Sequence, residues 1–177
     1  MQNRLIIISD LWGTPKSDWL QLYIPVLEPY FDIKYYDSSK LAGLDTIDYT
    51  QENLHQQFVK GGIDRAVQRL SKLETGRLTI LAFSIGGMIG WKAGLLGLSI
   101  DNFYAISATR LRYEKTTLNT NIYLFYGQKD PYQPNKEWFN LHHLNKNTFS
   151  NETHECYKKL NCAQAICKTI IGNKKDL

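Results

Sequence analysis

Apolar side chains along the chain fall into short blocks that alternate with longer segments in which apolar residues recur every three or four positions. Short apolar blocks indicate buried strands, and the longer spacing indicates amphipathic helices. We predict strands at 4–9, 31–36, 78–82, 100–106, 121–126 and 148–150. We predict helices at 15–29, 51–73, 85–96, 135–144 and 155–171, with Gly61-Gly62 interrupting the second, and a polar surface connection at 37–50.

Strands that alternate with helices predict one α/β domain over residues 1–177. We expect a doubly wound, mostly parallel six-stranded sheet with helices on both faces and right-handed crossovers. With a strand order of 2-1-3-4-5-6, the topological switch point lies between the first and third strands, and ligands bind there, outside the carboxyl ends of the strands. Trp12 and Ser84 follow those two strands.

Ser84 lies at an abrupt strand-to-helix turn, between Ala82 and Gly86. This A-x-S-x-G string is close to the G-x-S-x-G nucleophile elbow, in which small neighbours make room for a strained turn that exposes a serine hydroxyl. The departure is modest, since the first position requires only a small residue. The alternative is that Ser84 is an ordinary turn or cap residue, so the interpretation depends on a base and an acid elsewhere in the chain.

Two residues can complete a catalytic triad with Ser84. Asp130 follows the fifth predicted strand and His154 follows the sixth, so a parallel sheet places all three residues at one rim. Their order along the chain, Ser then Asp then His, is that of the α/β-hydrolases. Alternatively, Asp130 begins a helix and His154 caps one. The other histidines, at positions 55, 142 and 143, lie in predicted helices, and we expect that they do not reach this rim.

An oxyanion hole requires two backbone N–H groups that point at the developing negative charge. Ile85, directly after Ser84, is one predicted donor. The loop after the first strand should supply the other, at Leu11 or Trp12. For Trp12 the alternative is that its ring simply covers the end of the sheet.

Over almost its whole length the chain resembles a minimal α/β-hydrolase. The motifs are Ala-Phe-Ser84-Ile-Gly-Gly, Tyr-Gly-Gln-Lys-Asp130-Pro, Thr-His154 and the turn Ser-Asp-Leu-Trp12-Gly. They are similar to those of the pimeloyl-[acyl-carrier protein] methyl ester esterases of biotin synthesis. The resemblance implies a reduced α/β-hydrolase fold, a serine carboxylesterase that forms an acyl-enzyme on Ser84, and an oxyanion hole made by the N–H groups of Trp12 and Ile85.

The chain departs from that pattern in its oxyanion loop and at the position of the lid, and the family's first two strands are missing. Asp10 and Leu11 replace the usual His-Gly of the oxyanion loop, which brings an anion close to the predicted hole. A short linker at 107–119 stands where a lid domain normally inserts, so a short acyl chain or one delivered on a carrier fits best. Arg110, Arg112 and Lys115 in this linker predict attraction of an anionic substrate or an acidic acyl carrier protein. Ordinary charges on a solvated loop are the alternative.

Composition excludes several classes of protein. The 43% hydrophobic and 21% charged fractions are typical of a soluble globular protein, and a net charge of +4 is too weak to argue for nucleic-acid binding. We expect no signal peptide, membrane span, metal or cofactor. Three cysteines without a C-x-x-C motif favour reduced thiols and a cytoplasmic protein.

Two functions therefore remain. The first is a serine hydrolase that cleaves a carboxylic ester or thioester with Ser84, His154 and Asp130. The second is a non-catalytic α/β-hydrolase-like protein that binds a ligand or partner at the same rim. Asp10 in the oxyanion loop is the main sequence argument for the second.

Overall fold

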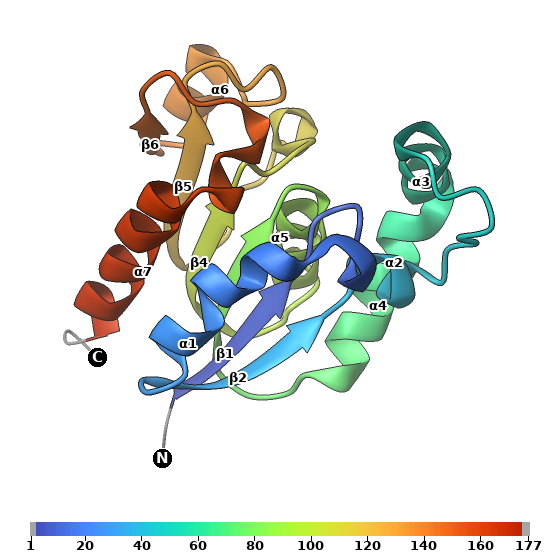
Figure 1. The fold of residues 1–177 in the computed structure, drawn as a ribbon, viewed down its shortest axis with the longest axis horizontal. Coiled ribbons are helices and arrows are strands. Elements are labelled where there is room, and N and C mark those ends of the chain that lie inside the picture. The colour runs from blue at the N-terminus through green and yellow to red at the C-terminus, as the bar shows by residue number, and fades with distance from the viewer. Residues whose placement is uncertain (1–2, 175–177) are drawn as a thin grey trace.

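The computed structural model describes residues 3–174 of the chain. Its centre is a six-stranded sheet in the order β2-β1-β3-β4-β5-β6, in which every neighbouring pair is parallel (Figure 1). The strands are β1 (Asn3–Ile8), β2 (Phe31–Tyr36), β3 (Leu78–Phe83), β4 (Ile100–Ile106), β5 (Asn121–Gly127) and β6 (Lys146–Phe149). The predicted fold class and strand order are confirmed.

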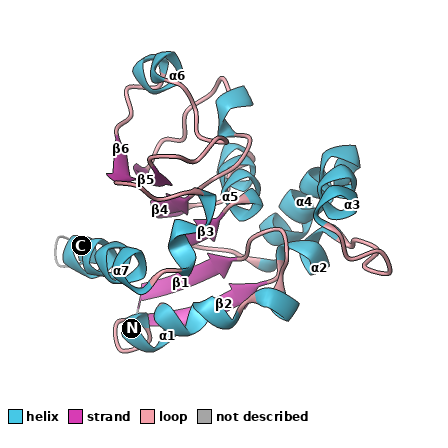
Figure 2. Ribbon diagram, turned by 45° about the horizontal axis from the view of Figure 1, so that its top comes forward, coloured by secondary structure: helices cyan, strands magenta, loops and turns pink. Residues whose placement is uncertain are grey.

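Helices cover both faces of the sheet (Figure 2). One face carries α2 (Ser38–Ala42), α4 (Ile63–Leu73), α5 (Ile85–Leu95) and α6 (Lys136–Leu141). The other carries α1 (Ile24–Leu27) and α7 (Leu160–Lys174). Successive side chains of a strand point to opposite faces, so Ile6 and Ile8 of β1 pack into the first core and Leu5 and Ile7 into the second. All four are fully buried, as expected for a central parallel strand.

The helix predicted at 15–29 is replaced by three shorter pieces. Two 3₁₀-helices, η1 (Thr14–Lys16) and η2 (Asp18–Leu22), precede the single turn α1. Pro25 interrupts the predicted helix, because its missing N–H and its ring prevent an α-helix from continuing through it. Trp19 and Leu20 of η2 are nevertheless buried.

The segment 37–50 is only partly the surface connection that we predicted. It contains α2, four of whose residues are buried. Asp37 caps this helix by accepting a hydrogen bond from the N–H of Lys40, and Gly43 ends it with a left-handed φ of 60°. A helix this short depends on its capping residues, and the pattern of apolar positions does not predict them.

The predicted interruption of the helix at 51–73 is confirmed. The chain forms α3 (Gln51–Gln57), one π-helical turn η3 (Phe58–Gly62) and then α4. Gly61 has a φ of 104°, which turns the chain at this point. As a result α3 stands apart from the sheet at one edge of the molecule (Figure 1).

The C-terminal region differs in detail. The last strand begins two residues earlier than the predicted 148–150, and α6 is shorter than the predicted 135–144. The closing helix is split into a 3₁₀-helix, η5 (His154–Lys158), and α7. Among residues 3–174, no helix is long and apolar enough to cross a membrane.

Candidate active site

Ser84 occupies a strained turn between β3 and α5. Its φ of 52° and ψ of −118° are conformations that residues other than glycine rarely adopt, at a cost of about 1–3 kcal/mol. Its N–H donates to the carbonyl of Ile106 on β4 at 2.9 Å, which fixes the turn against the sheet. The side chain therefore sits at the rim predicted from the topology, and Ser84 as a whole is 5% exposed.

The glycines after Ser84 allow this turn to pack against β1 and β4. A Cβ atom at Gly86 would lie 2.4 Å from the carbonyl oxygen of Ser9, and one at Gly87 would lie 2.4 Å from the Cβ of Ala108. Neither neighbour can move easily, because one is backbone and the other belongs to a buried residue. The glycines of the motif are therefore explained by close packing beneath the serine.

Ser84, His154 and Asp130 form a continuous chain of polar contacts. The Oγ atom of Ser84 lies 3.0 Å from Nε2 of His154. The Nδ1 atom of the same ring lies 2.9 Å from Oδ2 of Asp130. The Asp130 side chain is fully buried, while 20% of the His154 side chain remains exposed. The sheet thus brings together three residues that are 24 to 70 positions apart in sequence.

Close packing of the 152–153 segment on β5 places His154 beside Asp130. A Cβ atom at Gly127 would lie only 2.3 Å from the carbonyl oxygen of Thr153. The N–H of Lys129 donates to the carbonyl of Glu152 at 2.8 Å, which joins the two turns directly. Oδ1 of Asp130 accepts from the N–H of Tyr132 at 2.9 Å, so its other oxygen is directed at the histidine.

This arrangement determines which histidine nitrogen carries the proton. A carboxylate accepts hydrogen bonds and does not donate them, so Nδ1 of His154 is the protonated nitrogen facing Asp130. Nε2 is then a free acceptor for the hydroxyl proton of Ser84. The ring of Tyr132 packs edge-on against the imidazole, with centroids 5.0 Å apart, and restricts its rotation. An imidazole held in one orientation therefore lies within hydrogen-bond reach of the Ser84 hydroxyl.

The backbone N–H groups near Ser84 differ in whether they already have a hydrogen-bond acceptor. Ile85 is the first residue of α5, where N–H groups have no partner within the helix. The N–H of Trp12 donates to Oδ1 of Asp10 at 3.0 Å. In the stretch that the structure describes, no protein acceptor pairs with the N–H of the preceding residue, Leu11. Of the two loop positions considered from the sequence, only Leu11 has an uncommitted donor.

Asp10 is a structural part of this site. It is 1% exposed, and its second oxygen, Oδ2, accepts from the hydroxyl of Tyr157 at 2.9 Å. Burial raises the pKa of the Asp10 carboxyl, although the Tyr157 hydrogen bond opposes that rise. The pKa of Tyr157 is raised well above its ordinary value by burial and by the adjacent Asp10. Sequence reasoning noticed the charge of Asp10 but missed Tyr157, because only the fold brings η5 to the loop after β1.

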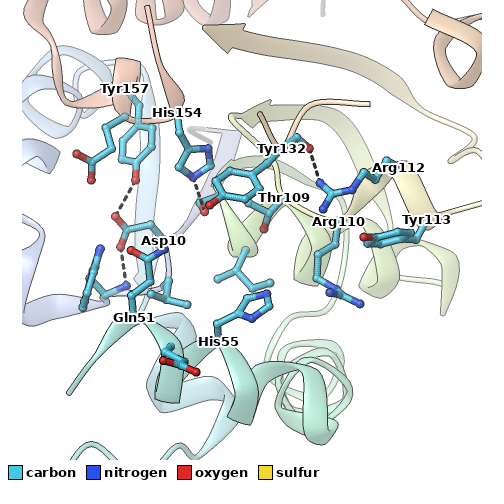
Figure 3. Close-up of a pocket in the computed structure, with 16 residues that line it drawn as sticks. Asp10, Gln51, His55, Thr109, Arg110, Arg112, Tyr113, Tyr132, His154 and Tyr157 are labelled. Atoms are coloured by element: carbon cyan, nitrogen blue, oxygen red, sulfur yellow. Dashed lines mark hydrogen bonds between the residues drawn. The ribbon is translucent and has the colours of Figure 1, made fainter. Parts of the chain in front are cut away.

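Ser84 lines a cavity of about 620 Å³. Figure 3 shows this cavity with its lining side chains. Its walls come from the loop after β1, from α3, from residues 109–113 and from the 154–157 turn. His55 of α3 lines it together with Ser84 and His154, so the expectation that His55 lies away from the rim was wrong. The reason is the break at Gly61, which turns α3 over the site. Burial, then the charges of Arg110 and Arg112, lower the pKa of His55.

The two predicted arginines both line this cavity but differ in their partners (Figure 3). Arg112 donates from its guanidinium to the carbonyl of Tyr132 at 2.8 Å. The Nε of Arg110 is buried and has no hydrogen-bond partner in the described protein. Both guanidinium groups pack on the ring of Tyr113, 5.0 and 4.7 Å from its centroid.

The remaining histidines do not join the site. His142 is buried against Trp138 and bonds to Thr117 and the carbonyl of Glu114. His143 follows it on the surface. Within residues 3–174, no group of three or more His, Cys, Asp or Glu side chains is arranged to hold a metal ion.

No protein-family model and no curated protein matches the sequence. Solved structures do match the fold. A candidate hydrolase of the alpha/beta superfamily from Xanthomonas campestris superposes with a TM-score of 0.69 at 13% identity, over 97% of this chain and 99% of that one. A candidate dienelactone hydrolase from Klebsiella pneumoniae gives a TM-score of 0.74 at 12% identity, over 99% and 88% of the two chains. Est1E from Butyrivibrio proteoclasticus, in a structure with bound ferulic acid, superposes with a TM-score of 0.62 at 12% identity, over 97% of this chain and 89% of that one.

These likenesses extend over nearly the full length of both chains in each pair. They establish that the chain has the compact α/β-hydrolase fold. At such low identity these likenesses show the fold alone. The chemistry depends on the residues at the rim.

Proposed function

We propose that this protein is a serine hydrolase that cleaves a carboxylic ester or thioester through an acyl-enzyme on Ser84. The observation that carries the proposal is the contact chain from Ser84 Oγ to His154 Nε2 at 3.0 Å and from His154 Nδ1 to Asp130 at 2.9 Å. A strained serine beside an oriented imidazole, at the floor of a cavity, has a direct use in nucleophilic catalysis. A binding protein would have no need of that arrangement.

In the proposed reaction, His154 accepts the hydroxyl proton as Ser84 Oγ attacks the carbonyl carbon. The tetrahedral intermediate collapses, and the leaving group departs with the proton from Nε2. A water molecule, deprotonated by the same nitrogen, then attacks the acyl-enzyme and releases the acid. Asp130 holds the imidazole in the required tautomer and stabilises its protonated form.

The oxyanion hole in this proposal is made by the N–H groups of Ile85 and Leu11. Ile85 begins α5, whose positive helix end adds to the field at the developing oxyanion. Leu11 replaces the sequence-based choice of Trp12, whose N–H is already bonded to Asp10. Trp12 instead shapes the wall, since its ring packs against Tyr49 and beneath the ammonium of Lys16.

The names of the structural neighbours support a hydrolase acting on an ester bond. The neighbours include candidate hydrolases and the ferulic-acid-bound Est1E. The narrower possibility is an esterase for the pimeloyl methyl ester carried on an acyl carrier protein, in the cytoplasm and without a cofactor. It rests on the sequence resemblance and on Arg110 and Arg112 at the cavity wall. Comparing turnover of free and carrier-bound methyl esters by the Arg110→Ala/Arg112→Ala double variant tests it, since equal losses on both would exclude a carrier contact.

A non-catalytic binding protein is the second candidate. It is favoured by the hydrogen bond from the N–H of Trp12 to Asp10, which occupies one backbone donor of the loop. The two candidates differ in whether Ser84 is an activated nucleophile.

A fluorophosphonate probe distinguishes them, because it labels only an activated serine. The wild type should be labelled and should hydrolyse 4-nitrophenyl esters, while Ser84→Ala should do neither. Ser99→Ala is the matched control, since Ser99 is exposed and lies at the opposite end of the sheet, just before β4. A wild type that is neither labelled nor active, or labelling that persists in Ser84→Ala, rejects the hydrolase.

A further inference from the structure

Arg110 is the cavity residue whose conformation and contacts are not explained by the fold. Its φ of 69° is left-handed, which is uncommon for a residue other than glycine. Its side chain is half-buried, and its buried Nε has no acceptor in the described part of the protein. A buried donor without a partner loses its bonds to water without replacement. Strained backbone and an unpaired donor together suggest that the residue is held in place for a ligand.

Arg110 and Arg112 together make one wall of the cavity electropositive. Both guanidinium groups flank the ring of Tyr113, and neither forms an ion pair with a described carboxylate. Arg112 uses one donor for the Tyr132 carbonyl. Arg110 makes no side-chain hydrogen bond within residues 3–174. The donors of its guanidinium group therefore remain available to a ligand.

The carboxylates around the cavity leave this wall positive. Asp10 is bonded to Tyr157 and to the N–H of Trp12, and Glu155, which also lines the cavity, is paired with Lys158. Glu52 of α3 lines the cavity without an ion pair in the described structure. Figure 3 shows Arg110 extending toward α3, where His55 lies. Besides burial, the positive charges of Arg110 and Arg112 lower the pKa of His55, so the field of the two arginines crosses the cavity.

We propose that Arg110 binds a carboxylate carried by the substrate, so that the enzyme acts on half-esters of dicarboxylic acids rather than on neutral esters. This inference rests on the proposed hydrolase function and specifies its substrate class. Ser84 and Arg110 line the same cavity, so one small molecule can present its ester to the first and its acid to the second. A guanidinium matches a carboxylate with two parallel hydrogen bonds. A single negative charge suits the site better than a phosphate dianion, because Glu52 shares the cavity.

The test compares two esters of nearly equal shape, the 4-nitrophenyl half-ester of glutaric acid and 4-nitrophenyl pentanoate. The wild type should prefer the acidic ester in kcat/KM. Arg110→Gln should reduce the ratio of the two kcat/KM values by about 10- to 100-fold, mainly through KM, as expected for loss of charge-assisted hydrogen bonds. Arg110→Lys should restore part of the preference. Lys115 is exposed and, unlike the two arginines, does not line the cavity, so Lys115→Gln is the matched control and should not change the ratio.

Binding of glutarate, measured by calorimetry or by NMR, separates this inference from the hydrolase proposal. If no ester is turned over but glutarate binds to the wild type and not to Arg110→Gln, the hydrolase proposal fails and the carboxylate site stands. If the ratio of kcat/KM values and the glutarate affinity are the same in the wild type and Arg110→Gln, the carboxylate site is excluded, whatever the activity.

Discussion

The hydroxyl of Tyr157 donates a hydrogen bond to Oδ2 of Asp10 at 2.9 Å, across 147 positions of sequence. Tyr157 lies three residues after His154 on η5, and Asp10 lies in the loop that carries Leu11. The bond therefore joins the element that holds the base to the loop that we propose supplies an oxyanion donor. Tyr157 is fixed in turn by an aromatic cluster with Trp19 and Phe83, at centroid distances of 4.9 and 5.4 Å.

Breaking this link should lower catalytic activity more than it lowers stability. Asp10→Ala removes the acceptor for both Trp12 and Tyr157, and we expect kcat for a 4-nitrophenyl ester to fall by about 100-fold because an oxyanion donor is misplaced. Asp10→Asn keeps one acceptor oxygen and the shape of the side chain, so it should lose less. Tyr157→Phe should fall between them.

A double variant provides the decisive control for that link. Because Asp10→Ala and Tyr157→Phe remove the same hydrogen bond, their combination should be little worse than Asp10→Ala alone. Wild-type kcat in Asp10→Ala, or fully additive losses in the double variant, would show that the bond does not position the loop.

Asp130 should be required for turnover through the orientation of His154. Asp130→Asn keeps the size of the side chain, but its amide nitrogen can donate to Nδ1 and so favours the wrong imidazole tautomer. We expect kcat to fall by about 10³- to 10⁴-fold, with a smaller change in KM. Steady-state kinetics and the rate of fluorophosphonate labelling check this. A loss below tenfold would mean that His154 does not depend on Asp130.

Most of the fold and the rim residues could be predicted because both follow from local patterns. Each strand is an apolar or alternating block, and the carboxyl ends of parallel strands necessarily meet at one rim. Ser84, Asp130 and His154 each follow a strand closely, so the predicted topology alone is enough to bring them together.

The rest of the site depends on packing that no local pattern encodes. Tyr157 looks like any apolar residue of a closing helix until η5 is placed against the loop after β1. His55 occupies a polar helix, and its position at the cavity follows from how far the chain turns at Gly61. The left-handed backbone of Arg110 has no sequence signature, because such conformations are expected at glycine or asparagine.

Gly127 should be essential for activity, although it is remote from the reacting atoms. Alanine at this position would place its Cβ 2.3 Å from the carbonyl oxygen of Thr153 and 2.5 Å from that of Glu152. The strand is fixed by the sheet, so the 152–153 segment has to move, and His154 moves with it. Gly127→Ala should therefore reduce kcat by about 100-fold or more, in keeping with the effect of small misplacements on catalysis.

Gly172→Ala is the matched control for that substitution. Gly172 lies in α7, and a Cβ atom added there would meet no neighbouring group within 4 Å. Alanine should therefore be tolerated and should stabilise the helix by up to about 1 kcal/mol. Urea unfolding and kcat are measured for both variants. Unimpaired turnover in Gly127→Ala would show that the close approach to Thr153 does not position the histidine.

The ionisation of Glu74 should make the free energy of unfolding depend on pH in the acid range. Its side chain is 2% exposed and accepts two hydrogen bonds from Arg4 at 2.8 and 2.9 Å, and others from Tyr36 and Lys34. Burial alone would raise the pKa of Glu74, but these partners outweigh it and lower the pKa from 4.5 to about 2. A depressed pKa means that the folded state favours the charged carboxylate. The resulting stability is fully present above pH 4.5 and is lost as the pH falls toward 2.

Glu74→Gln measures this contribution directly. Because Arg4 and Lys34 reach solvent and are partly screened, we expect the variant to be less stable than the wild type by about 2 kcal/mol at pH 7. The difference should shrink steadily below pH 4.5, because the carboxylate of the unfolded wild type is protonated there while the folded state still keeps it charged. Urea unfolding at pH 7, 4 and 3 provides the comparison, with Glu28→Gln as a control at an exposed carboxylate. A difference between the wild type and Glu74→Gln that stays constant over this range would mean that the ion cluster does not set the acid sensitivity of the fold.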